Sequence, residues 1–278
     1  MPLVSLPHLC MLDATPPELM RAAAAAGFSG VGVRLKPTMP GEAQHPMLDE
    51  SPMMRECLSI LADTGLKVLD IETFWLRPDT DPSSFRAEFE AAARLGALSL
   101  QVVSGDEDVS RMRDRFARMA EMAAPLNLRL EFEYMMISTV TSLGEALATL
   151  DHSGASNVGI LVDTLHIARC ATPVAELRRL EPRHVNVLQL CDAPMAPPVG
   201  HEAMLEEARF GRLLPGEGEL PLAGYWRALP AGHHVSVEVP LARTRHLPFE
   251  ARAQTVMEGF RAFCGRNDVP FEFAASAR

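Results

Sequence analysis

The chain is predicted to fold as a (β/α)₈ TIM barrel, in which eight parallel strands alternate with helices around one core. Apolar runs rich in β-branched residues recur at intervals of roughly thirty residues, and helical stretches lie between them. The length of 278 residues suits one barrel of this kind. A doubly wound open sheet is the alternative, but its phosphate-binding patterns GxGxxG and GxxxxGK[ST] do not occur in the sequence.

The eight predicted strands begin near Leu3, Gly30, Lys67, Ser99, Leu128, Val158, His184 and His234. After the first strand, Thr15 is a candidate helix N-cap because prolines occupy the next two positions, and Gly27 is expected to end that helix. Gly65 and Gly96 are expected to end the next two helices in the same way.

Three later segments also have helical periodicity. The segment 106–124 opens with acidic residues and then carries apolar residues at helical spacing, and shorter helices are expected at 142–150 and 249–263. No linker-like or low-complexity segment divides the chain, so residues 1–278 are predicted to form a single domain.

One long connection interrupts the repeating pattern. The stretch 192–232 separates the seventh and eighth predicted strands. A loop that leaves the carboxyl end of a barrel strand lies on the face where barrel enzymes place their active sites. Loops of this length usually have a role, so we expect this one to fold over the mouth of the barrel and help to exclude water.

The composition excludes several classes of protein. The net charge of −10 disfavours binding to nucleic acid or to an anionic membrane, and the longest apolar runs are too short to span a bilayer. The five cysteines are scattered and form no CxxC pair, which is typical of reduced thiols in a cytoplasmic protein. The first ten residues lack the pattern of a signal peptide.

Four polar side chains close four successive apolar strands in the second half of the chain. They are Glu133, Asp163, Gln189 and Glu238. Burying such groups is costly unless they have a partner, and strand alternation lets all four face the barrel axis at its carboxyl end. Carboxylate and amide oxygens suit a hard divalent cation, so the set predicts a site for Mn²⁺ or Mg²⁺, with Co²⁺ or Zn²⁺ as alternatives. Glu131 is a second candidate on the fifth strand, one layer deeper.

Other polar residues at strand ends are candidates for substrate binding. Asp192, just past the seventh strand, can bind substrate or cap the loop that follows it. The remaining candidates lie in the first half of the chain and are His8, Arg34, Glu72, Gln101 and Ser104.

The sequence resembles the xylose isomerase-like TIM-barrel superfamily, which contains sugar isomerases, ketose 3-epimerases and inosose dehydratases. The superfamily pattern of Glu, Asp, His or Gln, and Glu on the last four strands coincides with the four residues above. The DxxH spacing occurs in VDTLH, and an RxxPGxG loop begins at Arg212. The segments LQLCDAP and EEARFGRLLPGEG are also similar to those of bacterial 3-dehydroshikimate dehydratases, which carry Gln at the third ligand position.

The resemblance implies roles for two further residues and leaves one region unmatched. His166, three residues past Asp163, would be a catalytic or substrate-binding group near the metal, and Arg212 would hold an anion or hydroxyl of the substrate. Many members carry a glutamate on the second strand, where this chain has GVGVR. Barrels of this kind often form homodimers or homotetramers.

The predicted activity is a divalent-metal-dependent isomerase or epimerase of a sugar or keto-polyol, acting through an enediolate. Glu133 and Glu238 would exchange the proton from two sides of the site. The alternative is a dehydratase of a cyclic keto acid or inosose, in which a β-hydroxyl leaves and His166 or a water is the acid. A non-catalytic sugar-binding barrel is the alternative from another class. The superfamily also contains endonucleases for abasic DNA, but the acidic balance disfavours them.

Overall fold

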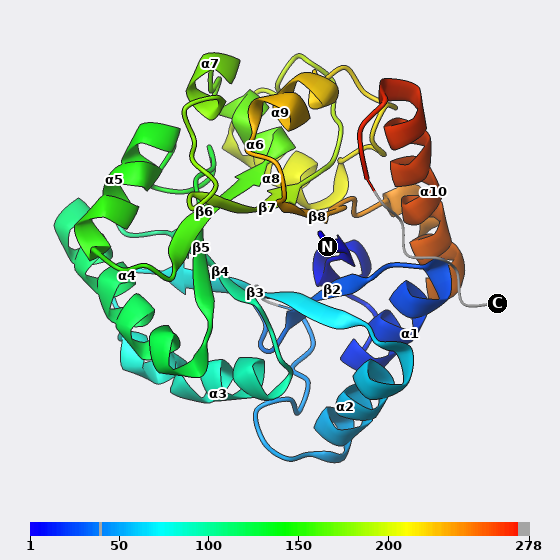
Figure 1. The fold of residues 1–278 in the computed structure, drawn as a ribbon, viewed down its shortest axis with the longest axis horizontal. Helices are drawn as coiled ribbons and strands as arrows, with labels where there is room; N and C mark the ends of the chain where they lie inside the picture. Colours follow the sequence, from blue (N-terminus) through cyan, green and yellow to red (C-terminus); the bar gives the residue numbers. More distant parts are fainter. Residues whose placement is uncertain (39–40, 272–278) are drawn as a thin grey trace.

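The computed structural model describes residues 1–38 and 41–271, and eight parallel strands close into a barrel in sequence order (Figure 1). The strands are β1 (Val4–Leu6), β2 (Gly30–Arg34), β3 (Lys67–Leu76), β4 (Ser99–Ser104), β5 (Arg129–Glu133), β6 (Val158–Asp163), β7 (Val185–Gln189) and β8 (His234–Ser236). Because β8 pairs with β1, the sheet has no free edge. The predicted (β/α)₈ fold is confirmed.

The helices form a ring outside the barrel (Figure 1). They are α1 (Pro16–Ala26), α2 (Pro52–Thr64), α3 (Arg86–Arg94), α4 (Val109–Ala123), α5 (Leu143–Ser153), α6 (Thr164–Arg169), α7 (Val174–Leu177), α8 (His201–Phe210), α9 (Leu222–Ala228) and α10 (Phe249–Asn267). The first and last long helices, α1 and α10, pack side by side and complete the ring. Within the described residues, no helix is long and apolar enough to cross a membrane.

The helix boundaries follow from local capping chemistry. Thr15 and Glu18 form a capping box at the start of α1, and Gly27 ends that helix with a φ of 84°. The helix expected at 106–124 begins later, at Val109, because the Asp108 side chain accepts a hydrogen bond from the backbone of Arg111 and caps it.

The strand register brings the predicted polar residues to one end of the barrel. Asp163 pairs with Gln189, which in turn pairs with Ser236, so adjacent strands end at the same level. The eighth strand is shorter than expected, and Glu238 lies two residues beyond its end. Its backbone N–H still donates to Leu190 O at 3.1 Å, which keeps Glu238 beside β7.

The segment 192–232 has more internal structure than the sequence indicated. It contains the two helices α8 and α9, and its residues Ala208, Arg209, Phe210 and Arg212 line a cavity at the carboxyl ends of the strands. The segment therefore forms one wall of the mouth of the barrel.

Candidate active site

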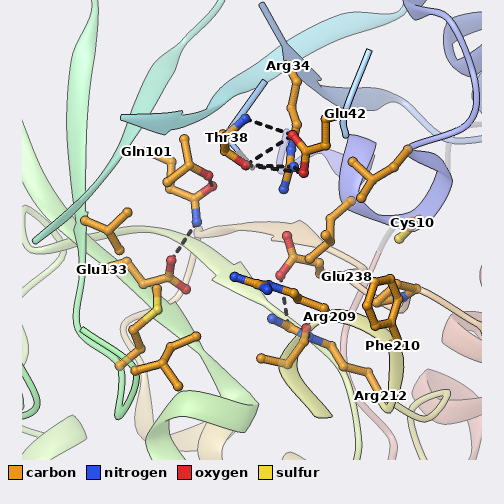
Figure 2. Close-up of a pocket in the computed structure, with 18 of the residues that line it drawn as sticks. Cys10, Arg34, Thr38, Glu42, Gln101, Glu133, Arg209, Phe210, Arg212 and Glu238 are labelled. Carbon is orange, nitrogen blue, oxygen red and sulfur yellow. Dashed lines mark hydrogen bonds and ion pairs between the residues drawn. The ribbon is translucent and has the colours of Figure 1, made fainter. Parts of the chain in front are cut away.

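A cavity of about 850 Å³ opens at the carboxyl ends of the strands (Figure 2). Its floor contains five of the predicted site residues, which are Gln101, Glu133, His166, Arg212 and Glu238. Apolar side chains such as Trp75, Met135 and Phe210 form part of its walls. The volume is within the range of small-molecule sites, and the mixture of apolar walls and convergent polar groups is typical of them.

Three side chains on neighbouring strands form a group that can hold a metal ion. Glu133 ends β5, Asp163 ends β6, and His166 lies in the first turn of α6. One potential ligand atom from each of these buried residues lies within 4.8 Å of the other two. The sequence placed His166 near the metal only through a family resemblance, and the structure places it among the candidate ligands.

Arg212 lies between Asp163 and Glu238. Its Nη1 atom is 2.6 Å from Asp163 Oδ2 and 2.9 Å from Glu238 Oε2, and all three side chains are buried. The Arg212 Nε–H donates to Ala208 O, which fixes the plane of the guanidinium. The four predicted ligands therefore do not form one open cage, because an arginine joins two of them.

Gln189 is oriented toward the same charges. Its Nε2 donates to Glu238 Oε1 at 3.1 Å, while its Oε1 is buried and accepts no hydrogen bond within the described residues. A buried amide oxygen without a donor is costly, and a cation is one partner that would satisfy it. Together with the Glu133 group, this oxygen shows that the donor set fits a divalent metal.

The electrostatics of Glu133 also favour a cation. Burial raises the pKa of Glu133 well above its usual range, and repulsion from Asp163 and Glu238 raises it further. The hydrogen bond that Gln101 Nε2 donates to Glu133 Oε2, at 2.6 Å, acts in the opposite direction and lowers the pKa of Glu133. No arginine or lysine within the described residues forms an ion pair with Glu133; its one ion-pair contact is His166 Nε2, at 3.8 Å.

The other titratable groups are affected differently. Burial acts to raise the pKa of Asp163, but the charge and hydrogen bond of Arg212, together with contacts from His166, more than offset this and the pKa is lowered. Burial raises the pKa of Glu238 to about 8 even though Arg212 opposes the rise. Burial lowers the pKa of His166 to about 4, so its imidazole is neutral and can accept a proton or bind a metal.

Of the two roles that the sequence left open for Asp192, the structure supports the capping of the loop that follows it. Both oxygens of its buried carboxylate accept backbone N–H groups, and the donors are Ala193, Gly216, Gly218 and Leu220. Asp192 also forms an isolated β-bridge with Leu213. It does not line the cavity and instead holds the loop that carries Arg212.

The candidates from the first half are divided between the cavity and the barrel interior. Arg34 lines the cavity and bridges Glu72, at 3.2 Å, and Glu42, at 2.6 Å (Figure 2). Glu72 does not line the cavity, because its carboxylate accepts hydrogen bonds from the backbone of His8 and Leu9. Gln101 lines the cavity and contacts Glu133, as described above.

Sequence reasoning missed three residues of the site. Thr73 donates its hydroxyl to Gln101 Oε1, Glu42 binds Arg34, and Arg209 lines the cavity. Thr73 lies in the middle of a strand and Glu42 in a loop, where no pattern marks them. Arg209 lies in the last turn of α8, and Arg212 follows just past the end of that helix.

The comparisons with known proteins agree with this geometry. Residues 20–263 match the family model described as xylose isomerase-like TIM barrel. The chain is 27% identical to a 3-dehydroshikimate dehydratase of Pseudomonas aeruginosa over 267 residues, which cover 90% of this chain and 40% of that protein. It is 25% identical to a 3-dehydroshikimate dehydratase of Pseudomonas putida over 232 residues, which cover 77% of this chain and 34% of that protein.

The chain therefore spans about two fifths or less of the length of these curated relatives. Among solved structures, it is similar to the IolI protein with a bound zinc atom, with a TM-score of 0.80, 16% identity, and coverage of 96% of this chain and 99% of that one. That likeness concerns the fold. From its closed barrel and its match over residues 20–263, the chain belongs to the xylose isomerase-like TIM barrel family.

Proposed function

We propose that the protein is a divalent-metal-dependent dehydratase of a cyclic hydroxy ketone, with 3-dehydroshikimate as the substrate to test first. The observation that carries the proposal is the asymmetry of the site. Glu238 is paired with Arg212, whereas Glu133 pairs with no arginine or lysine in the described part of the chain and lies beside a neutral imidazole. The two curated relatives named above are dehydratases of this kind, which supports the same choice.

Glu133, Asp163 and Gln189 would hold the metal, and the neutral imidazole of His166 would lie beside it. When bound, the ion supplies Lewis acidity to the substrate oxygens. Carboxylate and amide oxygens are compatible with Mn²⁺, Mg²⁺, Co²⁺ or Zn²⁺, so the donor set does not select one ion.

The residues of this chain supply the proton transfers. In 3-dehydroshikimate, the carbon next to the ketone carries a hydroxyl and an acidic proton, and the following carbon carries the hydroxyl that leaves. His166 is a neutral base that faces the cavity and can take the first proton. The same imidazolium can then protonate the leaving hydroxyl, which departs as water. Transfer of one further ring proton to the former ketone oxygen then gives aromatic 3,4-dihydroxybenzoate, so the overall reaction is the loss of one water.

Arg212 and Gln101 would keep the site in shape during these steps. Arg212 fixes Asp163 and Glu238, and Gln101 fixes Glu133 through a hydrogen bond that favours its ionised form. The apolar walls limit the access of water to the carbanion that forms.

An isomerase or epimerase is the second candidate. Glu133 and Glu238 both line the cavity, as a two-sided proton exchange requires. This reaction would need Glu238 to accept a proton from the substrate, although its two oxygens already accept hydrogen bonds or ion pairs from Gln189 and Arg212.

The test is turnover with added metal. Purified protein would be treated with a chelator, supplied separately with Mn²⁺, Mg²⁺, Co²⁺ or Zn²⁺, and given 3-dehydroshikimate. We expect 3,4-dihydroxybenzoate to form with at least one metal. The rate of its formation should fall at least about 1,000-fold in Glu133→Gln. The rate should be unchanged in Glu90→Gln, an exposed control on α3. Absence of product with every metal, together with epimerisation of free ketoses, would establish the second candidate instead.

A further inference from the structure

Arg209 is a half-buried cation in the lining of the cavity. Among the described residues, Arg209 donates no hydrogen bond and forms no ion pair, although it is half-buried and lines the cavity. Figure 2 shows its side chain extending into the cavity from the segment that carries Arg212 and Phe210. A partly buried guanidinium without an anion is unfavourable, so such a group usually has a ligand.

The other buried arginines of the cavity are neutralised. Arg34 is paired with Glu42 and Glu72, and Arg212 with Asp163 and Glu238. The third buried arginine, Arg252, binds Asp13 at 2.8 Å. Two further arginines of the lining, at positions 77 and 245, are exposed at the rim and stack on aromatic rings.

The two carboxylates whose charges act most strongly on Arg209 form no ion pair with it in this arrangement. Burial lowers the pKa of the Arg209 guanidinium, and Glu42 is the strongest charge that opposes this. Glu42 Oε1 already accepts from Arg34 Nη1 at 2.6 Å, and its Oε2 accepts from the backbone of Thr38 at 2.8 Å. Glu206, the other nearby acid, is exposed outside the cavity.

We propose that Arg209 determines substrate specificity by binding a carboxylate of the substrate, so that the enzyme selects an acidic hydroxy ketone over a neutral sugar. This rests on the proposed function, because the substrate oxygens at the other end must lie near Glu133 and His166. A planar guanidinium matches a carboxylate with two parallel hydrogen bonds.

The experiment compares two probes that differ only in the carboxylate. The probes are 3,4-dihydroxybenzoate and catechol, which share the pair of adjacent hydroxyls. Their dissociation constants would be measured by calorimetry on Mn²⁺-supplied protein, for the wild type, Arg209→Gln, Arg209→Lys and Arg178→Gln. Arg178 is exposed and does not line the cavity, so its variant controls for the loss of one positive charge.

We expect Arg209→Gln to weaken the binding of 3,4-dihydroxybenzoate about 10- to 100-fold, because a hydrogen-bonded charge pair is lost. Catechol should change less than about twofold in the same variant, since it lacks the group that Arg209 binds. Arg209→Lys should fall between the wild type and Arg209→Gln, because lysine keeps the charge but not the planar fork. Arg178→Gln should bind both probes as the wild type does.

Several results would overturn the proposal. Equal weakening of both probes in Arg209→Gln would show that the arginine only supports the shape of the site. Unchanged binding of 3,4-dihydroxybenzoate, or failure of the wild type to bind it, would remove the carboxylate site. The proposed function can fail separately. If 3,4-dihydroxybenzoate binds in a way that depends on Arg209, but the protein does not convert 3-dehydroshikimate, the carboxylate site is supported and the proposed function is not.

Discussion

At the scale of single residues, the charges of the site explain why Arg212 and a metal can coexist. Glu133, Asp163 and Glu238 are three buried carboxylates, and Arg212 neutralises one charge among them. With one divalent ion added, the group as a whole is neutral, which a low-dielectric interior favours. The arginine therefore sets the charge of the ion that the site balances best.

The orientation of Gln101 leads to a first prediction. Because the Thr73 hydroxyl donates to Gln101 Oε1, the amide turns its Nε2 toward Glu133. Gln101→Leu should weaken metal binding about 10- to 100-fold, since a group that supports a ligand is lost. Thr73→Val is the matched control and should have a smaller effect. Metal titration by calorimetry would show this, and an unchanged affinity in Gln101→Leu would contradict the role.

A second prediction concerns acid stability and His8. The imidazole accepts the Arg34 N–H at Nδ1 and contacts Ala14 O through Nε2, so it is held neutral. Burial lowers the pKa of His8, which means that the unfolded chain binds a proton more readily than the folded one. Stability should therefore be lost as the pH falls below about 6.5, the ordinary histidine value.

His8→Gln should reduce this pH dependence. The slope of the unfolding free energy against pH should fall by at most about 1.4 kcal/mol per pH unit between pH 6.5 and 5. Urea unfolding at several pH values would measure it. If the curves of unfolding free energy against pH are parallel for the variant and the wild type, His8 does not contribute to the pH dependence. His166, whose pKa is lowered to about 4, would then account for the part due to buried histidine.

At the scale of elements, the loop after β7 depends on one carboxylate. Asp192 accepts four backbone N–H groups, two of them from Gly216 and Gly218. A Cβ at Gly218 would lie 2.5 Å from both Ala193 O and Asp192 Oδ1, so this close approach requires glycine. Hydrogen bonds from the backbone of this loop to Asp192 therefore help to fix the position of Arg212.

The third prediction follows from this arrangement. Asp192→Ala should loosen the segment around residues 211–220 and lower turnover about 100-fold through displacement of Arg212, while the barrel stays folded. Limited proteolysis followed by mass spectrometry should show new cleavage in that segment. Gly218→Ala should act in the same direction. Resistance to protease together with full activity in both variants would refute the role given to Asp192.

The elements also show what the sequence could and could not predict. Strand order and the cap at Thr15 depend on local patterns, and both were predicted correctly. Strand alternation predicted that Glu133 and Glu238 face the barrel axis, and both line the cavity, although Glu238 lies beyond the end of β8. The bridge from Arg212 to Asp163 joins residues 49 apart in sequence, through a long loop whose path no periodicity describes. For the same reason the supporting role of Asp192 could not be distinguished from substrate binding.

At the scale of the whole molecule, a bound metal should stabilise the fold. An ion that binds only the folded protein at about 100 times its dissociation constant adds about 2.7 kcal/mol to the unfolding free energy. For a domain of this size we expect the melting temperature to rise by about 5–10 °C. Thermal unfolding after chelation, with and without Mn²⁺ or Zn²⁺, would measure the rise. Glu133→Gln should lose most of it, and equal melting temperatures in the wild type would contradict metal binding.

The segment that carries α8 and Arg212 has a consequence for how such enzymes diversify. Arg209, Phe210 and Arg212 lie within four consecutive positions of the segment 192–232, and the backbone that follows them is joined to the barrel through Asp192. Recombination or directed evolution could change Arg209 and Phe210 while leaving every strand, the Glu133 group and Arg212 in place. New substrate preferences would then arise without the loss of folding that usually accompanies changes in a barrel interior.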